Sequence, residues 1–439
     1  MSLTILIVGS GPAGCYVCEQ LLKHNKMLSI DIIDKNPYPF GLLRTGVAPD
    51  HERIKGLQRY FEKSLDNETV TFYANVEFGV DITYETIKNA YHAIFICTGS
   101  ATDNRHNKLD YTHDLNCGSL QLVNWYNGHP YNKSAFKPEF LGKSVGIIGL
   151  GNVALDIARI FLKEPSKLAS TEIPEDVIDF LKAKPISTVH IFVRRGPAQA
   201  KCTPKELAEL LELDNVCVNL HDFRLSETDL DEAKESNRVQ KNIDLFKNVS
   251  RSSNTNKKQL HIHFYSKLKQ CSYSDSNLNL LFTKTKLIGT ANQQKLCDTE
   301  NTHSLSTQYL ISSIGYKGTE IAGIPFNSNT QKLDHIQGHV TDNIFTAGWI
   351  KRGPTGVIGT NKRDAQESVN SFISKLDILK QSKCSPFNLK TYLEKNKRLF
   401  FTFQDWKKID QKELDLGLEK NKNRVKISDL NKIKSLLSS

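Results

Sequence analysis

The chain has 439 residues, of which 39% are hydrophobic and 24% charged, and its formal net charge is +10 at pH 7. This composition supports a sizeable core and excludes a wholly disordered protein. At about 150 residues per domain the length predicts two or three domains. No apolar run reaches the roughly 20 residues of a membrane-spanning helix, which predicts a soluble protein. No targeting peptide is recognisable before the first predicted strand at Leu3, so the native protein lacks one or the sequence is a mature or trimmed form.

The basic excess is moderate and is spread along the chain among acidic residues. It suits phosphate-bearing cofactors or an acidic protein partner. No zinc-finger, RNA-recognition or basic-zipper pattern accompanies it, which argues against nucleic acid. Nine cysteines in a chain of this length do not form a disulfide scaffold, and the odd count favours free thiols in a reducing compartment.

The N-terminal residues carry a dinucleotide-binding pattern. The expected order is strand, glycine turn, helix and strand, at residues 3–8, 9–14, 12–23 and 29–33. Of the three glycines, Gly9 permits the tight turn, Gly11 lets the backbone approach a pyrophosphate, and Gly14 allows the helix to pack closely on the strand. Asp34 ends the second strand, where an acid binds ribose hydroxyls. The pattern predicts a first dinucleotide site with Asp34 as the ribose ligand.

The same pattern recurs further along the chain. Its strand, turn, helix and second strand are expected at residues 144–148, 149–154, 152–162 and 188–193. Here the glycines are Gly149 and Gly151, Ala154 replaces the third, and Arg194 and Arg195 follow the second strand instead of an acid. Two guanidinium groups would hold a 2′-phosphate that an acid would repel. The site whose second strand ends in an acid predicts FAD, and the site whose second strand ends in two arginines predicts NADPH. Hydride would then pass from NADPH to the flavin, and single electrons would leave the flavin.

The remaining segments give weaker predictions. Apolar strands are expected at residues 93–97 and 309–314, a polar helix at 230–249, a mobile loop at 250–258, and Lys-rich surface helices over the last roughly 40 residues. Cys15 and Cys18 form a CxxC pair inside the first predicted helix, where packed thiols are favoured over a redox pair. His261 and His263 lie on an alternating polar stretch that predicts a solvated strand, and no metal site is expected.

Five motifs closely resemble the adrenodoxin reductase family of ferredoxin–NADP⁺ reductases. They are the opening glycine turn, PFGLLRTGVAPDH at 39–51, GLGNVALDIAR at 149–159, RRGP at 194–197 and GWIKRGPTGVI at 348–358. The resemblance extends to FQDW at 403–406 and so covers essentially the whole chain. It implies an α/β fold of two Rossmann-like dinucleotide-binding domains, with the NADP domain inserted into the FAD domain. The expected boundaries are 1–103 and 338–439 for the FAD-binding domain and 104–337 for the NADP-binding domain.

The resemblance also implies site residues. Beyond the glycine turn and Asp34, which stands where the family has Glu, the positions that match FAD contacts are Ala13, Leu42, Val76, Trp349, Gly356, Val357 and Ile358. The positions that match NADP contacts are Gly149, Leu150, Gly151, Asn152, Arg194, Arg195, Glu206 and Gly356. His51 and Asp156 match a polar pair near the flavin–nicotinamide meeting point, where they would orient water or stabilise charge. The alternative for both residues is a structural role behind the groups that contact the rings, because direct hydride transfer needs no general acid.

The family's partner is a small acidic [2Fe–2S] ferredoxin that docks on a basic face. The candidate docking positions are Lys23, Arg238, Lys241 and Lys247, with a solvated insertion as the alternative for the last three. Ala208 departs from the Arg that animal members carry, which leaves the choice of ferredoxin open.

The expected activity is NADPH:ferredoxin reduction. The alternatives are a related flavin reductase, such as the small subunit of glutamate synthase, and a nucleotide-binding redox sensor without turnover. Eukaryotic members work in the mitochondrial matrix, in iron–sulfur cluster assembly or steroid hydroxylation, whereas bacterial members are cytosolic.

Overall fold

The chain of the computed structural model divides into two compact units, and the structure describes residues 3–24, 28–131, 136–249, 257–381 and 384–438. Unit 1 comprises residues 1–102 and 316–439, and unit 2 comprises residues 103–315. The second domain boundary was expected between residues 337 and 338, whereas in the structure the chain returns to unit 1 at residue 316. Ile321, Ile324 and Leu333 explain the difference, because they are buried in a hydrophobic core of unit 1.

Unit 1 is built from both ends of the chain. Its first part contains β1 (Leu3–Val8), α1 (Pro12–His24), β2 (Leu28–Asp34), α2 (Leu42–Thr45), α3 (Glu52–Lys55), α4 (Leu57–Leu65), β3 (Val70–Ala74), α5 (Tyr84–Ile87) and β4 (Ala93–Ile96). Its second part contains β15 (Tyr316–Lys317), β16 (Phe326–Asn327), β17 (Lys332–Leu333), β18 (His339–Thr341), β19 (Ile344–Thr346), α13 (Trp349–Arg352), α14 (Thr360–Ser374), α15 (Leu376–Gln381), α16 (Leu389–Lys395), α17 (Phe403–Glu419) and α18 (Leu430–Ser438).

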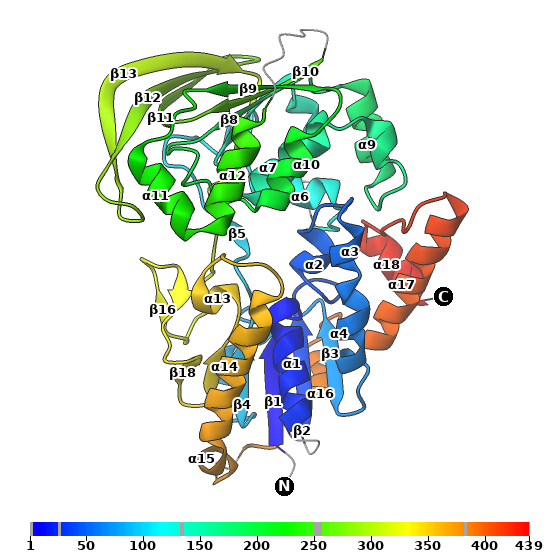
Figure 1. The fold of residues 1–439 in the computed structure, drawn as a ribbon. Helices are drawn as coiled ribbons and strands as arrows, with labels where there is room; N and C mark the ends of the chain where they lie inside the picture. The colour runs from blue at the N-terminus through cyan, green and yellow to red at the C-terminus, as the bar shows by residue number, and fades with distance from the viewer. Residues whose placement is uncertain (1–2, 25–27, 132–135, 250–256, 382–383, 439) are drawn as a thin grey trace. The chain divides into compact units, whose positions relative to one another are not determined.

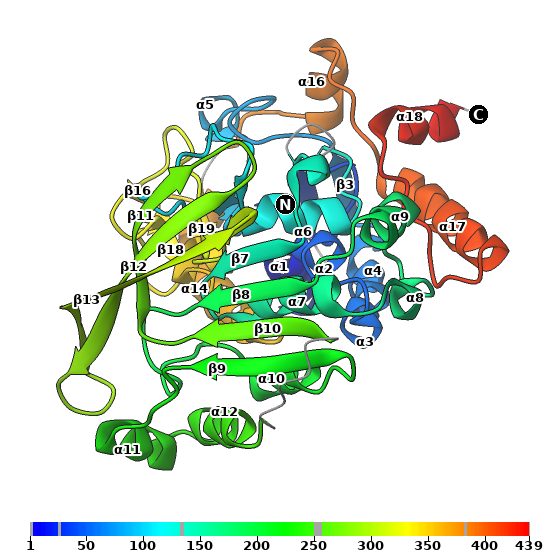
Figure 2. The ribbon, with the colours of Figure 1, turned by 90° about the horizontal axis from the view of Figure 1, so that it is seen from above.

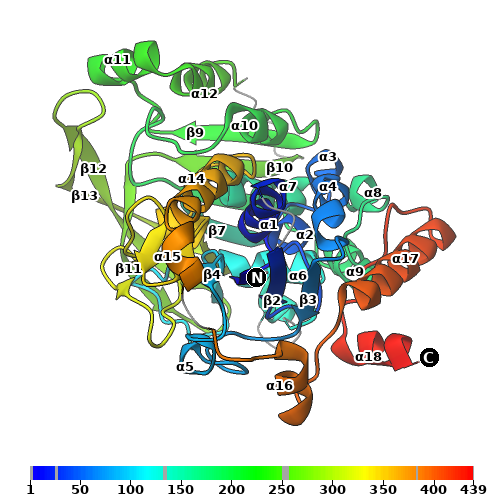
Figure 3. The same cartoon turned by 90° about the horizontal axis from the view of Figure 1, so that it is seen from below.

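A six-stranded sheet forms the centre of unit 1, in the order β18-β19-β4-β1-β2-β3. β1 is parallel to β2 and to β4, and β19 is parallel to β4, whereas β18 is antiparallel. The apolar residues of β1 and β4 are buried, as expected of parallel strands covered on both faces. Helices α1 and α14 lie side by side against this sheet (Figures 1 and 3). The expected strands at 3–8, 29–33 and 93–97 are confirmed within one residue at each end.

Unit 2 is one continuous segment, which the chain enters within β5 (Thr102–Asp103). It contains β6 (Asn116–Gly118), α6 (Ser119–Tyr126), the 3₁₀ helix Pro138–Phe140, β7 (Ser144–Ile148), α7 (Asn152–Leu162), α8 (Pro165–Leu168), α9 (Glu175–Ala183), β8 (Thr188–Phe192), α10 (Pro204–Leu211) and β9 (Val216–His221). The elements α11 (Glu227–Glu235), α12 (Asn237–Lys247), β10 (Lys258–His263), β11 (Ser266–Tyr273), β12 (Leu278–Ile288), β13 (Lys295–Thr307) and β14 (Tyr309–Ser312) follow.

Its main sheet has six parallel strands in the order β6-β14-β7-β8-β10-β9. In Figure 2 the labelled strands β7, β8, β10 and β9 follow one another in this order. β11, β12 and β13 form a separate antiparallel sheet. The two sheets, one mainly and one wholly parallel, confirm the expected α/β class with two Rossmann-like units. The strands expected at 144–148 and 188–193 are β7 and β8.

The helix expected at residues 230–249 is two helices. Ser226 caps α11 by accepting from the backbone N–H of Asp229, and Ser236 caps α12 by accepting from that of Val239. A serine that forms such a cap begins a new helix, because its own backbone is extended there. Most of the loop expected at 250–258 lies outside the described residues, and Lys258 already begins β10.

The expectation of a solvated strand at His261 and His263 is wrong. β10 is an inner strand, paired with β8 on one side and β9 on the other. His261 and His263 therefore lie on one face of the sheet with His190 of β8 and His221 of β9. We call these four residues the histidine array. A ring nitrogen of His190 lies 3.1 Å from one of His263, and His221 and His261 approach to 3.0 Å.

Burial of the histidine array predicts acid sensitivity. Burial, together with the neighbouring histidines, lowers the pKa of His190 to about 3 and that of His263 to about 2. The unfolded chain binds protons near pH 6.5 and the folded chain does not, so stability is lost as the pH falls below 6.5. From pH 7 to 5 we expect the free energy of unfolding to fall by at most about 2 kcal/mol per imidazole.

Urea titrations at pH 7 and pH 5 measure this loss, with His263→Phe expected to reduce it. The control is His24→Gln, which removes an exposed histidine at the end of α1. A loss of stability that is the same in the His263→Phe protein and in the parent would contradict the prediction.

Candidate functional site

The first glycine turn joins β1 to α1 in a conformation that only small residues allow. Gly9 has φ +104°, and a Cβ there would lie 2.5 Å from the carbonyl oxygen of Cys97. A Cβ on Gly14 would lie 1.9 Å from the carbonyl oxygen of Gly9. The N–H of Gly9 donates to the carbonyl of Ile33 at 2.8 Å, which joins the turn to the end of β2.

The second glycine turn repeats this geometry in unit 2. Gly149 has φ +111°, and a Cβ there would lie 2.3 Å from the carbonyl oxygen of Ser313. Its N–H donates to the carbonyl of Phe192 at 2.9 Å. Gly149 in unit 2 therefore corresponds to Gly9 in unit 1, and Phe192 corresponds to Ile33.

Gly11 and Gly151 differ from the other glycines of the two turns. A Cβ at either position would meet no atom within 4 Å, and neither residue has a positive φ. Folding therefore does not require glycine at these positions. Each is the second glycine of its turn, whose backbone approaches the pyrophosphate in dinucleotide-binding proteins. The open space at each position is the feature expected of a phosphate cradle next to a helix N-terminus.

Asp34 is 6% exposed, and protein donors surround its carboxylate. One oxygen accepts from the backbone N–H of Ser10 at 2.8 Å and from the Ser10 hydroxyl at 2.7 Å. The other accepts from the backbone N–H and the side-chain amide of Asn36. The carboxylate thus fastens the first glycine turn to the end of β2. The sequence pattern did not anticipate this contact with Ser10.

The arginine pair occupies the corresponding edge of unit 2. Val193 stands at the position that corresponds to Asp34, and Arg194 and Arg195 follow it. Arg194 is exposed and Arg195 is partly exposed. Neither guanidinium has a hydrogen-bond or ion-pair partner among the residues that the structure describes. Their backbone carbonyls are held, since Arg194 accepts from the Thr285 hydroxyl at 2.7 Å and Arg195 from the N–H of Tyr265 at 3.2 Å.

The start of α10, which is tied to the second glycine turn, contains two buried polar atoms without partners among the described residues. The side-chain carbonyl of Asn152 accepts from the N–H of Thr203 at 2.8 Å, which ties the start of α7 to the start of α10. Within the part of the chain that the structure describes, the Thr203 hydroxyl and one carboxylate oxygen of Glu206 are buried and have no hydrogen-bond partner. Buried polar groups are normally hydrogen-bonded, so these two atoms fit a site that a polar ligand completes.

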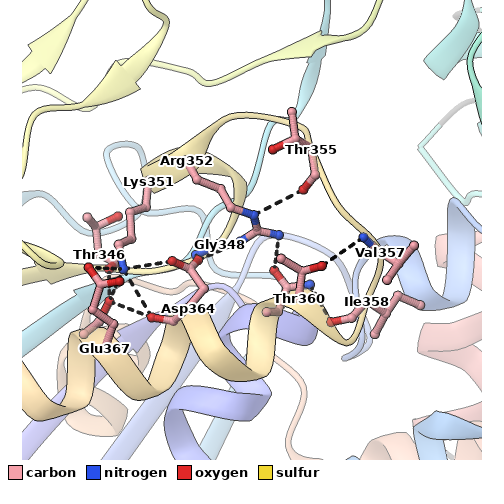
Figure 4. Close-up of polar contacts among 12 residues, drawn as sticks. Thr346, Gly348, Lys351, Arg352, Thr355, Val357, Ile358, Thr360, Asp364 and Glu367 are labelled. Carbon is pink, nitrogen blue, oxygen red and sulfur yellow. Dashed lines mark hydrogen bonds and ion pairs between the residues drawn. The ribbon is translucent and has the colours of Figure 1, made fainter. Parts of the chain in front are cut away.

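A polar network fixes the segment that begins at Gly348 (Figure 4). Asp364, on α14, accepts from the N–H of Gly348 and from the Arg352 guanidinium at 2.6 Å. The same guanidinium donates to the carbonyl of Thr355 at 3.2 Å and to the side chain of Asn361 at 2.9 Å. The network therefore fixes the loop 353–359 at both ends.

A buried lysine completes this network. Lys351 is 3% exposed and lies 2.8 Å from Asp364 and 3.5 Å from Glu367, as Figure 4 shows. Within the loop, Gly356 has φ +83°, and Val357 is 61% exposed and donates its N–H to the Thr360 hydroxyl at 3.2 Å. Ile358 follows, and its carbonyl accepts from Asn361. Asp364 was not among the predicted site residues, and no sequence motif singled it out.

Several predicted FAD positions of unit 1 gather around the first glycine turn. Ala13 packs against Gly348, because a Cβ added to Gly348 would lie 2.5 Å from the methyl carbon of Ala13. Trp349 begins α13 next to this contact and is partly exposed. Val76 is buried after β3, with its N–H donating to the carbonyl of Asp34 at 2.9 Å. Leu42 begins α2 and is partly exposed.

His51 and Asp156 lie in different units, so each is described in its own unit. His51 precedes α3 and is partly exposed, and its N–H donates to the carbonyl of Ala48 at 3.0 Å. Asp156, on α7, is 9% exposed and accepts from Arg159 at 2.7 Å. Arg159 also lies 3.9 Å from Glu209. Asp156 is therefore part of a buried ion pair.

Comparisons with known proteins identify the family. Residues 7–75 match the model of the NAD(P)-binding Rossmann-like domain. The chain is 34% identical to the mitochondrial NADPH:adrenodoxin oxidoreductase of Arabidopsis thaliana, over 97% of this chain and 93% of that protein. It is 31% identical to the NADPH-ferredoxin reductase FprA of Mycobacterium tuberculosis, over 97% of both chains. The solved structure of that FprA with NADPH has a TM-score of 0.92 at 29% identity over the full length of both chains.

The chain belongs to the adrenodoxin reductase family. It is thus an NADPH:adrenodoxin/ferredoxin oxidoreductase family member, as the sequence motifs predicted. The whole-length matches also favour this family over the related flavin reductases.

The candidate docking residues of this reductase differ in whether their charged groups already have a partner in the protein. On α1, Lys23 forms an ion pair with Glu19. The guanidinium of Arg238 donates to the carbonyl of Ala200. Lys241 and Lys247, on α12, are exposed and have no partner among the described residues. The neighbouring α11 exposes Glu227, Asp231 and Glu235, so the segment is basic along α12 alone.

The cysteines of the reductase fit a structural role. Cys15 and Cys18 are fully buried in α1, and burial raises the pKa of both thiols, that of Cys18 to about 12. Thiols of this kind are poor nucleophiles, as expected for packed residues. Among the described residues, no group of three His, Cys, Asp or Glu side chains is arranged to hold a metal ion. No helix of that part of the chain is long and apolar enough to cross a membrane.

Proposed function

We propose that unit 1 holds FAD, that unit 2 holds NADPH, and that the enzyme reduces a small acidic [2Fe–2S] ferredoxin. The observation that carries the proposal is one turn geometry present twice. It is followed by a buried acid in unit 1 and, in unit 2, by two guanidinium groups that have no partner among the described residues. A 2′-phosphate distinguishes NADPH from NADH, and it is the group that such an arginine pair binds.

The residues of unit 1 fit FAD. The open space at Gly11 would admit the pyrophosphate, while Gly9 and Gly14 keep the turn close to β4 and α1. The remaining proposed contacts are Ala13, Asp34, Leu42, Val76, Trp349, Gly356, Val357 and Ile358. Because protein donors surround the carboxylate of Asp34, its contribution to FAD binding acts largely through the order of the turn.

The residues of unit 2 fit NADPH. Gly149, Leu150, Gly151 and Asn152 would hold the pyrophosphate at the start of α7. Arg194 and Arg195 would bind the 2′-phosphate, and Glu206 would use its unpartnered carboxylate oxygen. Gly356 is also proposed as an NADP contact and is described with unit 1, to which it belongs.

The residues of unit 1 would hold FAD, which would supply a group that can accept a hydride from NADPH and pass electrons on singly. The chain's own residues bind and orient the two nucleotides, and no general acid is required for a direct hydride transfer. We propose that His51 and Asp156 orient water or stabilise charge near the reacting rings. The ion pair with Arg159 keeps Asp156 in place for that role.

The proposed compartment is the mitochondrial matrix, with iron–sulfur cluster assembly as the process, or the cytoplasm if the chain is bacterial. The Arabidopsis thaliana relative is named as mitochondrial, and that name supports the first location.

A reconstitution assay tests the proposed function. The purified protein is expected to be yellow and to reduce cytochrome c only when NADPH and an acidic [2Fe–2S] ferredoxin are both present. Reduction of cytochrome c without ferredoxin, or a colourless protein that does not bind added FAD, would contradict the proposal.

Salt dependence tests the proposed docking on α12. The Debye length falls from roughly 10 Å at 0.1 M salt to about 3 Å at 1 M, so the attraction between a basic face and an acidic partner weakens. We expect added salt to slow ferredoxin-dependent cytochrome c reduction far more than ferricyanide reduction, which needs no protein docking. The variants Lys241→Glu and Lys247→Glu are expected to produce the same selective loss at low salt.

The matched control is Lys269→Glu, which reverses an exposed charge on β11 of the same unit. It is expected to leave the ferredoxin reaction unchanged. If salt slowed both assays equally, or if the α12 variants behaved as Lys269→Glu does, docking on α12 would be ruled out.

A further inference from the structure

Residues 38–45 pack against the first glycine turn. We call them the 38–45 segment. Its Phe40 has a φ of +80°, a conformation that non-glycine residues rarely adopt, and donates its N–H to the carbonyl of Ser10 at 3.0 Å. Gly41 also has a positive φ, and a Cβ there would lie 3.1 Å from the Cα of Gly11. A shift of this segment would therefore change the space at Gly11.

The other side of the segment is fastened through a buried arginine. Arg44 is 1% exposed, and its Nη2 donates to both carboxylate oxygens of Glu413, at 2.6 and 2.9 Å. Its guanidinium carbon lies 4.5 Å from the ring centre of Tyr38 and 4.8 Å from that of Trp406. Such contacts between a cation and aromatic faces are strongest where water is excluded.

Glu413 and Trp406 both belong to α17, near the C-terminus, and both are buried. Glu413 also accepts from Arg424 at 2.7 Å and from the N–H of Ile427 at 2.8 Å. Burial alone would raise the pKa of Glu413, but Arg44 and Arg424 lower it. The carboxylate is therefore charged at neutral pH, and its removal would leave Arg44 buried without its counter-charge.

The backbone of the segment is fastened as well. The carbonyl of Arg44 accepts from the ammonium groups of Lys55 and Lys426, each at 3.0 Å. Trp406 also meets the ring of Phe40 edge to face, with 5.7 Å between the ring centres. The residue with the strained backbone thus packs on the same helix that binds Arg44.

We infer that α17 is a positioning element for the flavin: Glu413 and Trp406 hold the 38–45 segment in the conformation that keeps the first glycine turn open for FAD. This inference rests on the proposed function, which assigns FAD to unit 1. Neither α17 residue belongs to the proposed FAD contacts, so their effect passes through Arg44 and Phe40 to Ser10 and Gly11.

The test compares two substitutions on the same helix. Glu413→Gln keeps the size of the side chain and removes the charge that Arg44 needs. Asp410→Asn is the matched control, because Asp410 pairs at 2.6 Å with Arg424 and not with Arg44. Full-length proteins are freed of flavin, and the dissociation constant for added FAD is measured from flavin fluorescence, alongside the visible spectrum of the bound flavin and the affinity for NADP⁺.

We expect Glu413→Gln to bind FAD about tenfold more weakly and to alter the flavin spectrum, since a charge-assisted bond is lost. Affinity for NADP⁺ is expected to be unchanged, and Asp410→Asn is expected to match the parent. Trp406→Phe is the second variant, in case Glu413→Gln does not fold. Parent-like FAD binding by the folded Glu413→Gln and Trp406→Phe proteins would overturn this inference but not the proposed function. A parent protein that does not bind FAD would overturn the proposed function and this inference together.

Discussion

Replacing both Arg194 and Arg195 with Gln is expected to remove roughly 2–4 kcal/mol of the preference for NADPH over NADH, since each charge-assisted hydrogen bond contributes about 1.5–3 kcal/mol and some compensation occurs. The guanidinium groups have no partner among the described residues, so their removal breaks no ion pair described in the protein. Folding should therefore be unaffected, and the loss should appear for the 2′-phosphorylated nucleotide alone.

The measurement is the ratio of kcat/KM for NADPH to that for NADH, with ferricyanide as acceptor. Arg224→Gln is the control, because Arg224 belongs to the same unit and lies 4.4 Å above the ring of Tyr265. If the double variant kept the parent ratio, Arg194 and Arg195 would not be the residues that bind the 2′-phosphate.

The variants Gly11→Ala and Gly151→Ala should each weaken the binding of one nucleotide while leaving the fold intact. A methyl group fits at both positions in the protein alone, because no atom lies within 4 Å. It would occupy the space through which the pyrophosphate reaches the backbone. The expected loss is roughly 10- to 100-fold in affinity, equivalent to about one charge-assisted hydrogen bond. Gly11→Ala should affect FAD, and Gly151→Ala should affect NADP⁺.

Flavin retention on a desalting column and the dissociation constant for NADP⁺ separate the two outcomes. Each variant is the control for the other, since it carries the same change in the other unit. Loss of NADP⁺ binding in Gly11→Ala with retention of FAD would mean that the two nucleotides are assigned to the wrong units. Gly14→Ala is unsuitable for this comparison, because its methyl group would collide with the backbone of Gly9.

The sequence predicted the elements whose causes are local. A short apolar run predicts a buried strand, and the glycines directly after it predict the backbone conformation of the turn. For this reason β1, β7 and the turns after them appear where expected. The arginine pair was predicted for the same reason, since its place follows from the end of β8.

Features that depend on distant residues were not predictable in this way. His261 and His263 alternate as in a half-exposed strand, and the order of the sheet placed β10 between two others. Glu413 lies in a Lys-rich region that suggested a surface helix, and its burial depends on Arg44, 369 residues earlier. Asp364 likewise binds Gly348 and Arg352, and only the folded loop brings these two residues to its carboxylate.

The discontinuous sheet of unit 1 also sets an order of events during synthesis of the protein. β4 leaves the ribosome early, but its partner β19 is made about 250 residues later, roughly 10–50 s at ordinary translation rates. Until then β4 has an open edge, and α1 lacks α14 beside it. Unit 2 is continuous and can fold in the meantime. A nascent chain that stops after residue 315 therefore contains a complete unit 2 and an unfinished unit 1, and the proposed flavin site is the last part of the enzyme to be completed.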